Sequence, residues 1–431
     1  MNLPNVRNLK RFRSRLWPTC WLLVWITTGC TPNAIETTTE NVASKRDRMV
    51  GHFVDSEKTD SLASELDRPV SSEPISPSRY QHSESRIPAS NSKSTTNDSR
   101  PPILAIQLRD TTAFGIPIGL FSDQTLMMRS DGAIQRIQNS EIIQQSILKD
   151  RFRAIDQAEL SQQLRAEFGR AYLVRSESPY LIVARAEHME IWRHRFKSLY
   201  HSFRLYCSTH GIATREIEFP LIAVVFGSHD EFLRYANSTQ SKLPENCAGF
   251  YFSDSNRIAL YESPDVSVQE IQASICHEAT HQIAFNVGLH QRAAVTPLWI
   301  VEGLAGMFES PMFSGLQSRD GKSGWPTSRR STWNALAKKP EALQRIVAGL
   351  IQNDSSFKND TENAYCVAWA MTIYLSQRHS QLYGTYLQKN GNREPFQEYT
   401  TSQRLTDFEN AFRADSRILT KKIISYLETL H

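Results

Sequence analysis

The sequence predicts an α+β fold: a small mixed sheet and a mostly helical C-terminal part, preceded by a small β-rich module and a disordered linker. Between residues 101 and 262, short apolar runs recur between turn residues, a pattern typical of strands. Beyond Ser267 the apolar residues recur at helical spacing to the end of the chain. Residues 31–100 are rich in Ser, Thr, Asn, Asp, Glu and Pro and contain only two aromatics, Phe53 and Tyr80. Such a stretch cannot bury enough apolar surface to fold, so we expect a flexible tether.

The first 30 residues have the layout of a lipoprotein-type signal peptide. An apolar run at residues 21–26 is too short to span a bilayer, which needs about 20 apolar residues. The run ends near Gly29-Cys30, which resembles a bacterial lipobox, although Thr27 stands where an aliphatic residue is usual. We therefore expect export, lipidation of Cys30 and attachment to a membrane of the cell envelope. A plain cleaved signal and an uncleaved anchor are the alternatives. The run is preceded by basic residues, namely Arg7, Lys10, Arg11, Arg13 and Arg15.

Length, charge and cysteine content set further bounds. A chain of 431 residues is long enough for one large or two modest domains. Its net charge of +4 is too small to indicate nucleic acid as a partner. The cysteines after the signal lack the close spacing of a cysteine zinc site, so we expect buried free thiols or at most one disulfide. These cysteines are Cys207, Cys247, Cys276 and Cys366.

Residues 101–170 are predicted to form the β-rich module. Asp131-Gly132, between two apolar runs, is a strong hairpin signal, and a helix is expected near residues 155–168. The predicted strands of this meander are residues 103–108, 116–121, 124–129 and 133–137.

The second domain, residues 171–431, opens with elements of both kinds. Residues 180–184 and the apolar run 219–226 are predicted strands, and residues 230–236 a short helix. We expect residues 249–262 to form a hairpin at the edge of the site, where Ala259 lies in the edge-forming segment and can hold substrate as an added strand. A purely structural hairpin is the alternative. A long amphipathic helix is predicted over residues 187–209, with core positions Ile191, Phe196, Leu199, Tyr200, Phe203 and Leu205.

A helix that begins at a capping box at Ser267 and stops at Gly288 carries the most informative motif. In His277-Glu-Ala-Thr-His281 the two histidines lie one turn apart on one face and can bind one tetrahedral metal ion. Glu278 is rotated by about 100° from the first histidine, so it can flank the metal without ligating it. Apolar residues surround the motif, which predicts a buried helix, and buried His and Glu need partners. The pattern is typical of zinc hydrolases.

A later apolar helix contains Glu302, far enough beyond His281 for the chain to turn and return alongside. A carboxylate within an apolar helix is costly unless it is paired. Gly303 and Gly306 would let the helices approach closely. Together with His277 and His281, Glu302 completes a His₂Glu set, which leaves one coordination position open, as a catalytic zinc requires.

These two segments resemble a known signature. His277-Glu-Ala-Thr-His281 with Trp299-Ile-Val-Glu302-Gly-Leu-Ala is similar to that of gluzincin metallopeptidases, HExxH followed by a WxxEGxA helix. The wider stretch 249–309 resembles the planctomycete-type domain of unknown function 1570 family, placed among peptidase MA-like proteins. The resemblance, which covers roughly residue 171 to the C-terminus, implies a peptidase with one catalytic Zn²⁺ ligated by His277, His281 and Glu302. Thermolysin-type enzymes carry an Asp four residues after the ligand Glu, bonded to the first His; here that position is Gly306, so the sequence does not name the partner of His277.

We therefore expect a zinc-dependent peptidase that hydrolyses peptide bonds with a metal-activated water and with Glu278 as the general base. The expected partners are a peptide or protein substrate and, through the lipid anchor, a membrane. One alternative is a cell-envelope binding or scaffold protein with a non-catalytic zinc site; another is a zinc hydrolase of a non-protein amide or ester. The intact Glu278 favours an enzyme over the scaffold.

Further polar residues allow more than one interpretation. Tyr365, on a later apolar helix, is a candidate catalytic donor to the oxyanion, or else a packed core tyrosine. Glu309 could share the helix face of Glu302, or be a solvated or capping carboxylate. Three histidines without metal-ligand spacing are predicted at the surface: His210, His229 and His290.

Overall fold

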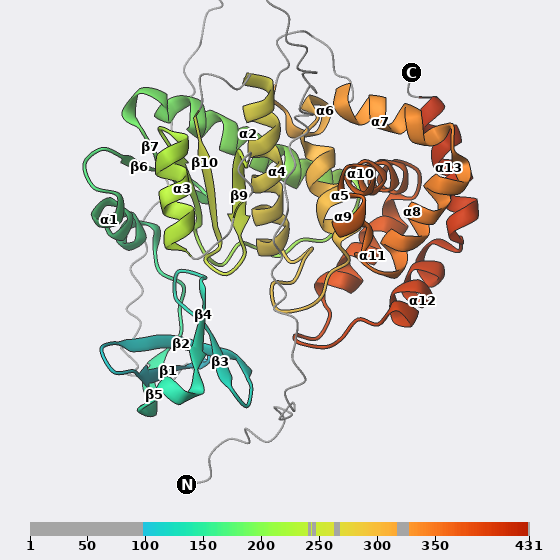
Figure 1. Cartoon of the computed structure of the whole chain (residues 1–431). Helices are drawn as coiled ribbons and strands as arrows, with labels where there is room; N and C mark the ends of the chain where they lie inside the picture. The colour runs from blue at the N-terminus through green and yellow to red at the C-terminus, as the bar shows by residue number, and fades with distance from the viewer. Residues whose placement is uncertain (1–97, 240–242, 244–246, 263–267, 317–326, 430–431) are drawn as a thin grey trace, which may run out of the picture. The chain divides into compact units, whose positions relative to one another are not determined.

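The computed structural model describes residues 98–429 apart from 240–242, 244–246, 263–267 and 317–326 (Figure 1). The predicted signal peptide with Cys30, nearly all of the predicted tether and the capping box at Ser267 lie outside the described residues. The described part is mixed α and β with a mostly helical C-terminal part, which confirms the predicted fold class. None of its helices combines the length and apolar character that a membrane crossing requires.

The first sheet consists of five antiparallel strands in the order β4-β3-β2-β1-β5. Its first four strands form the predicted meander, and Gly132 takes a left-handed φ of 79° in the turn between β3 and β4, as the Asp-Gly pair predicts. The fifth strand was not expected, because its side chains are almost all exposed and show no apolar alternation. The strands are β1 (Pro102–Gln107), β2 (Thr112–Leu120), β3 (Gln124–Met128), β4 (Ile134–Gln138) and β5 (Gln144–Arg151).

The second sheet has the order β6-β7-β8-β10-β9 and mixes both pairing modes. β8 lies parallel to β7 and β10, whereas β6 and β9 are antiparallel edge strands. Ala259 in β10 pairs with Val224 on one side and Phe250 on the other, so the expectation that its segment forms the edge is wrong. The edge of the predicted hairpin is β9. The strands are β6 (Leu173–Glu177), β7 (Tyr180–Ala184), β8 (Leu221–Phe226), β9 (Gly249–Phe252) and β10 (Arg257–Tyr261).

Helices cover both faces of the second sheet, which explains the uninterrupted apolar run of β8. Ala223 and Val225 point to one face, where α2 (Met189–Thr209) and α4 (Val268–Asn286) pack. Ile222 and Val224 point to the other, where α1 (Gln157–Phe168) and α3 (His229–Ser238) pack. In Figure 1, α4 runs alongside β9, which places the motif helix next to the edge of the sheet.

The helix α2 agrees with its predicted span, but two of its predicted core positions are wrong. Ile191 and Leu205 are 50% and 58% exposed. The buried residues of α2 recur every three or four positions from Trp192 onward and so lie on one helix face. Ile191 and Leu205 are each one position away from a residue of this stripe and therefore point elsewhere. That stripe consists of Trp192, Phe196, Leu199, Phe203 and Tyr206.

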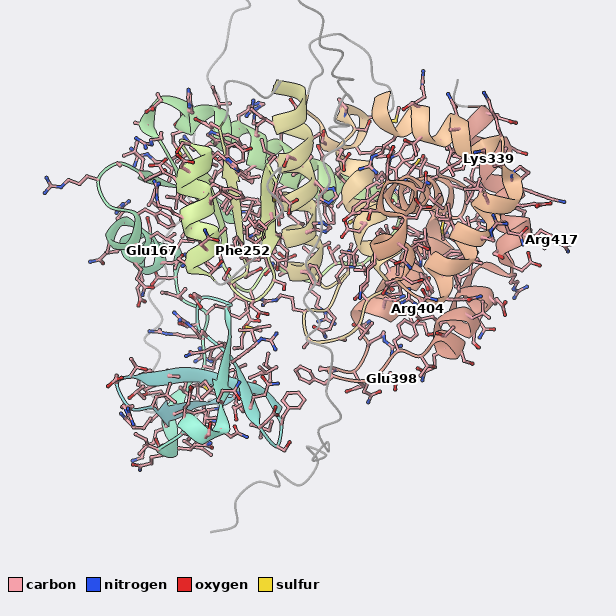
Figure 2. All side chains as sticks on the ribbon, in the orientation of Figure 1. Glu167, Phe252, Lys339, Glu398, Arg404 and Arg417 are labelled. Carbon is pink, nitrogen blue, oxygen red and sulfur yellow. The ribbon has the colours of Figure 1, made fainter. Side chains whose placement is uncertain are left out.

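The C-terminal part is a set of packed helices that surround α5 and α10. Buried Arg404, labelled in Figure 2, donates to the carbonyl oxygens of Leu350 and Ile351 and pairs with Asp354 at 2.8 Å. Asp354 Oδ1 also accepts a hydrogen bond from the Leu298 N–H, so the start of α5 is fixed by a distant loop. The helices are α5 (Leu298–Phe308), α6 (Pro311–Ser314), α7 (Thr327–Ala337), α8 (Pro340–Gln352), α9 (Ser356–Asn359), α10 (Thr361–Arg378), α11 (Ser380–Gly391), α12 (Thr401–Phe412) and α13 (Ser416–Glu428).

The cysteines after residue 98 are buried free thiols, in line with the first of the two expectations. Burial raises the pKa of Cys276, next to the motif, to about 12, so its thiol is inert at neutral pH. Cys276 therefore contributes to the packing of α4.

Candidate metal centre

The motif histidines lie on a helix that is buried on nearly every side. Apolar residues of α4 pack into the main core, and α4 ends before Gly288, which takes a left-handed φ of 82°. His277, Glu278 and His281 are therefore at most 3% exposed. The two imidazole rings project from successive turns with their centroids 4.6 Å apart.

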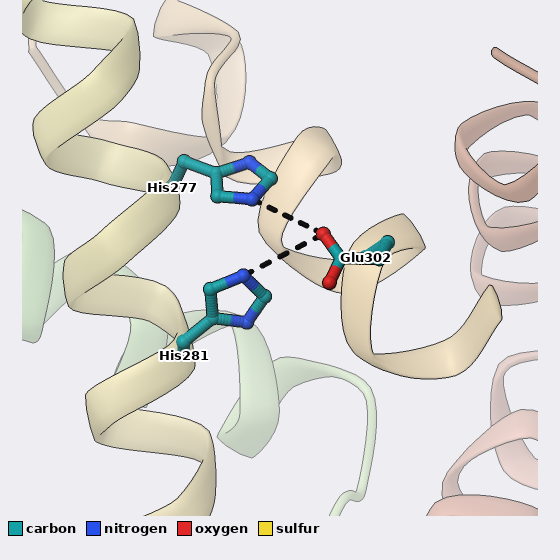
Figure 3. A group of neighbouring side chains, drawn as sticks. All are labelled: His277, His281 and Glu302. Carbon is teal, nitrogen blue, oxygen red and sulfur yellow. Dashed lines mark ion pairs between the residues drawn. The ribbon is translucent and has the colours of Figure 1, made fainter. Parts of the chain in front are cut away.

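Glu302 enters from α5, which packs against α4. Its Oε2 lies 3.2 Å from Nε2 of His277 and 3.6 Å from Nε2 of His281, as the dashed lines in Figure 3 show. Ligand atoms of these residues all lie within 4.8 Å of one another. Among the described residues this is the one group of at least three His, Cys, Asp or Glu side chains that could hold a metal ion. The structure thus brings together the three predicted ligands.

The donor atoms fit a metal ion. Both Nε2 atoms and Oε2 of Glu302 are buried without a hydrogen-bond partner, although they lie within ion-pair distance of each other. Buried polar atoms in that condition are costly unless something binds them. Two imidazole nitrogens and one carboxylate oxygen form the donor set of catalytic zinc sites. We conclude that the group can bind a metal ion.

Burial and mutual contact shift the pKa values of all three side chains in the group. Burial lowers the pKa of His277, but the neighbouring carboxylates of Glu302 and Glu309 outweigh it and raise that pKa to about 10. Burial opposes ionisation of Glu302 as well, yet His281 and His277 hold the pKa of its carboxyl at about 2. Burial lowers the pKa of His281. The centre therefore contains an ionised carboxylate facing two imidazoles in a water-poor environment.

Glu309 is the partner of His277 that the sequence could not name. Its Oε1 lies 2.8 Å from Nδ1 of His277, on the opposite side of the ring from Glu302. Arg329 of α7 pairs with both oxygens of Glu309. Glu309 is not solvated, since its side chain is largely buried. It is the C-cap residue of α5, as the capping interpretation expected, and it also reaches the same histidine as Glu302, as a shared helix face predicts. The signal was the spacing of seven residues, which returns to the same helix face.

Glu278 stands next to the group without belonging to it. Its Oε2 accepts a hydrogen bond of 2.6 Å from the backbone N–H of Tyr251 in β9, while its Oε1 has no hydrogen-bond partner. Burial raises the pKa of Glu278 to about 8, with a further contribution from Glu302 and an opposing one from His277. One carboxylate oxygen is thus fixed by the edge strand and the other is available.

Tyr365 lies at the same centre, on α10. Burial raises its pKa well above the ordinary value, and the charges of Glu302 and Glu278 raise it further, with Glu302 as a hydrogen-bond partner. Its ring packs edge-on against Phe357, with the centroids 5.2 Å apart. The position of Tyr365 is thus compatible with both interpretations. Its ring packs against Phe357, as a core tyrosine would, and its hydroxyl lies beside Glu302, as a catalytic donor would.

His290 is not at the surface, contrary to expectation. It is buried in the loop after α4, its Nε2 has no hydrogen-bond partner, and burial together with the charge of His281 lowers its pKa to about 3. No local sequence pattern predicts the burial of His290, because the loop has no periodic pattern of apolar residues. His210 and His229 are half-buried, and their rings pack at a tilt against those of Tyr206 and Tyr261, respectively.

Comparison with known proteins adds one family relationship. No curated protein matches the chain. Residues 271–397 match the model of a family described as a protein of unknown function (DUF1570), and this segment contains His277, Glu302 and Tyr365. The predicted resemblance to this family is thereby confirmed for the segment that forms the metal centre.

Proposed function

We propose that the protein is a zinc-dependent peptidase that hydrolyses peptide bonds with Glu278 as the general base. The observation that carries the proposal is the buried group of His277, His281 and Glu302, beside a further carboxylate that is held separately from it. The three ligands leave one coordination position open, as catalytic zinc sites do.

The chemistry divides between the metal and the chain. A zinc ion at this site would polarise a substrate carbonyl and would make a water molecule acidic near neutral pH. Glu278 would take a proton from that water at its available Oε1 while the Tyr251 N–H holds Oε2 in place. Glu278 would then return the proton to the leaving amine nitrogen. The carbon–nitrogen bond breaks and the water supplies oxygen to the new carboxyl group.

Tyr365 would assist as the carbonyl oxygen gains negative charge. Its hydroxyl lies at the ligand Glu302 and its pKa is raised, so it keeps its proton and can donate a hydrogen bond. A donor aimed at the developing oxyanion lowers the barrier for acyl transfer.

The test measures metal content and peptide cleavage in the same preparations. We expect the purified protein to contain one zinc ion per chain and to cleave members of a broad peptide library, with the products identified by mass spectrometry. Glu278→Gln should keep the zinc and lose activity by about 10²- to 10⁴-fold, the usual contribution of a general base. Exposed Glu341→Gln on α8 is the matched control and should change neither quantity.

Two outcomes would contradict the proposal. Zinc binding without cleavage of any peptide would favour the scaffold function or another amide or ester as substrate. Unchanged cleavage by Glu278→Gln would show that Glu278 is not the base.

A further inference from the structure

The imidazole of His277 contacts a carboxylate at each ring nitrogen. Nε2 faces Glu302 at 3.2 Å and Nδ1 faces Glu309 at 2.8 Å. An ionised carboxylate can only accept a hydrogen bond, so Nδ1 carries the proton that it donates to Glu309. His281 differs, since its Nδ1 has no hydrogen-bond partner among the described residues. The orientation of His277 is therefore specified from outside the ligand group.

Glu309 is itself held in place by Arg329. The Arg329 Nε lies 3.2 Å from Oε2 of Glu309, and its Nη2 contacts Oε1. Both side chains are largely buried. A guanidinium that contacts both oxygens fixes the plane of a carboxylate as well as its charge.

Gly306 provides the space for this arrangement. A Cβ at Gly306 would lie 3.2 Å from Nη2 of Arg329, closer than most side-chain contacts allow. The guanidinium thus rests against the part of α5 that has no side chain, one turn after Glu302. Arg329 also donates through Nη1 to the carbonyl oxygen of Tyr365 at 3.4 Å, so the same side chain links the end of α5 to α10.

We infer that Glu309 is a positioning residue for metal binding, which keeps the proton of His277 on Nδ1 and directs Nε2 toward Glu302, and that Arg329 acts through Glu309. The inference deepens the proposed function and rests on the zinc site that it assumes. A carboxylate partner of a ligating histidine fixes its tautomer and ring orientation and raises its basicity. Glu309, directly after α5, and Arg329 of α7 thereby connect these helices to His277 of α4.

The experiment compares zinc dissociation constants, measured by competition with a chromogenic chelator on the whole protein. Glu309→Ala should weaken zinc binding by about 10- to 100-fold, as loss of such a partner usually does. Glu309→Gln should weaken it less, because the amide oxygen can still accept from Nδ1 but carries no charge. Arg329→Gln should also weaken binding, and it should add nothing in the Glu309→Ala background, since residues that act as one unit are not additive.

Controls separate this effect from general destabilisation. Glu231→Gln breaks an ion pair of 2.8 Å with Arg185 outside the site and should leave the zinc constant unchanged. Circular dichroism and thermal unfolding identify variants that remain folded, and the conservative Glu309→Gln decides the case if Glu309→Ala does not fold. Folded Glu309 variants that bind zinc as tightly as the parent would overturn the inference. A full additional loss from Arg329→Gln in the Glu309→Ala background would overturn the role given to Arg329.

The same measurements distinguish this inference from the proposed function. A parent protein that binds zinc but cleaves no peptide would contradict the peptidase proposal, while the ratio of zinc constants would still decide the role of Glu309. A parent protein that binds no zinc would overturn both.

Discussion

Gly303 of α5 lies so close to Ala368 of α10 that a Cβ at this glycine would stand 2.6 Å from the Ala368 carbonyl oxygen and 2.1 Å from Thr372 Oγ1. The glycine next to Glu302 does permit a close helix approach, but the approaching helix is α10, which carries Tyr365, and not the motif helix α4 that the sequence suggested. The spacing between a predicted metal ligand and a predicted oxyanion donor is therefore set by the absence of one methyl group.

Gly303→Ala should move α10 away from α5 and lower both stability and activity. Inserting a methyl group into a tightly packed contact costs about 1–3 kcal/mol, even though alanine favours a helix. We expect a lower unfolding temperature and a lower kcat with zinc binding largely retained, because α4 and Glu302 need not move. Gly349→Ala in α8 is the matched control, since its Cβ would meet only the Ser356 hydroxyl. Equal stability and kcat in both variants would show that the contact is loose.

Glu302→Ala should reduce zinc affinity by more than about 100-fold, because a direct ligand contributes more than the partner of a ligand. The variant should also lose the stabilisation that excess zinc gives to the parent, about 4 kcal/mol when zinc exceeds its dissociation constant by 1,000-fold. Chelator competition and thermal unfolding with and without zinc measure the two effects. Exposed Glu341→Ala provides the comparison. Parent-like zinc affinity in Glu302→Ala would refute its assignment as a ligand.

Tyr365→Phe should separate the two interpretations of this side chain. If the hydroxyl stabilises the oxyanion, kcat should fall by about 10²- to 10³-fold while KM and zinc affinity stay close to those of the parent. If Tyr365 is only a packed residue, kcat should not change. Tyr374→Phe on the same helix is the control, because its hydroxyl contacts His379 and not the metal ligands.

The sequence was most informative where a spacing has a geometric meaning. The separation of His277 and His281 by four residues and the carboxylate in an apolar helix predicted three side chains that the structure places within 4.8 Å of one another. These inferences succeed because an α-helix has a fixed period and because buried polar groups need partners.

The parts that were not predicted depend on tertiary contacts. Arg329 comes from a helix whose sequence gives no sign that it returns to Glu309. The strand β5 pairs along β1 through its backbone while its side chains face solvent, so its sequence has no alternation to detect. The hairpin was recognised, but which of its strands forms the edge depends on β8, which pairs with β10 and leaves β9 outside.

A network around Asn256 holds the edge strand β9 against α4. Asn256, in the hairpin turn, takes a left-handed φ of 56° and its Oδ1 accepts a hydrogen bond of 2.8 Å from the Tyr251 hydroxyl. Its side chain also exchanges hydrogen bonds with Asn286 of α4, and its carbonyl accepts from Gln282, the residue after His281. Because the Tyr251 N–H holds Glu278, we expect this network to position the proposed general base.

Asn256→Gly should therefore lower kcat more than zinc affinity. Glycine keeps the left-handed backbone and the carbonyl that Gln282 binds, but it removes the hydrogen bonds to Tyr251 and Asn286, at a cost in stability of about 1–3 kcal/mol for each buried group left unpaired. A small displacement of Glu278 should reduce kcat by about 10- to 100-fold, since misplacing a catalytic group by about 1 Å can have this effect. Zinc affinity should stay near the parent value, because the ligands lie on α4 and α5. The control is Asp254→Ala, in the same turn but exposed and paired with Arg136. If kcat is unchanged in folded Asn256→Gly, or if zinc affinity falls in proportion, the network does not act through the general base.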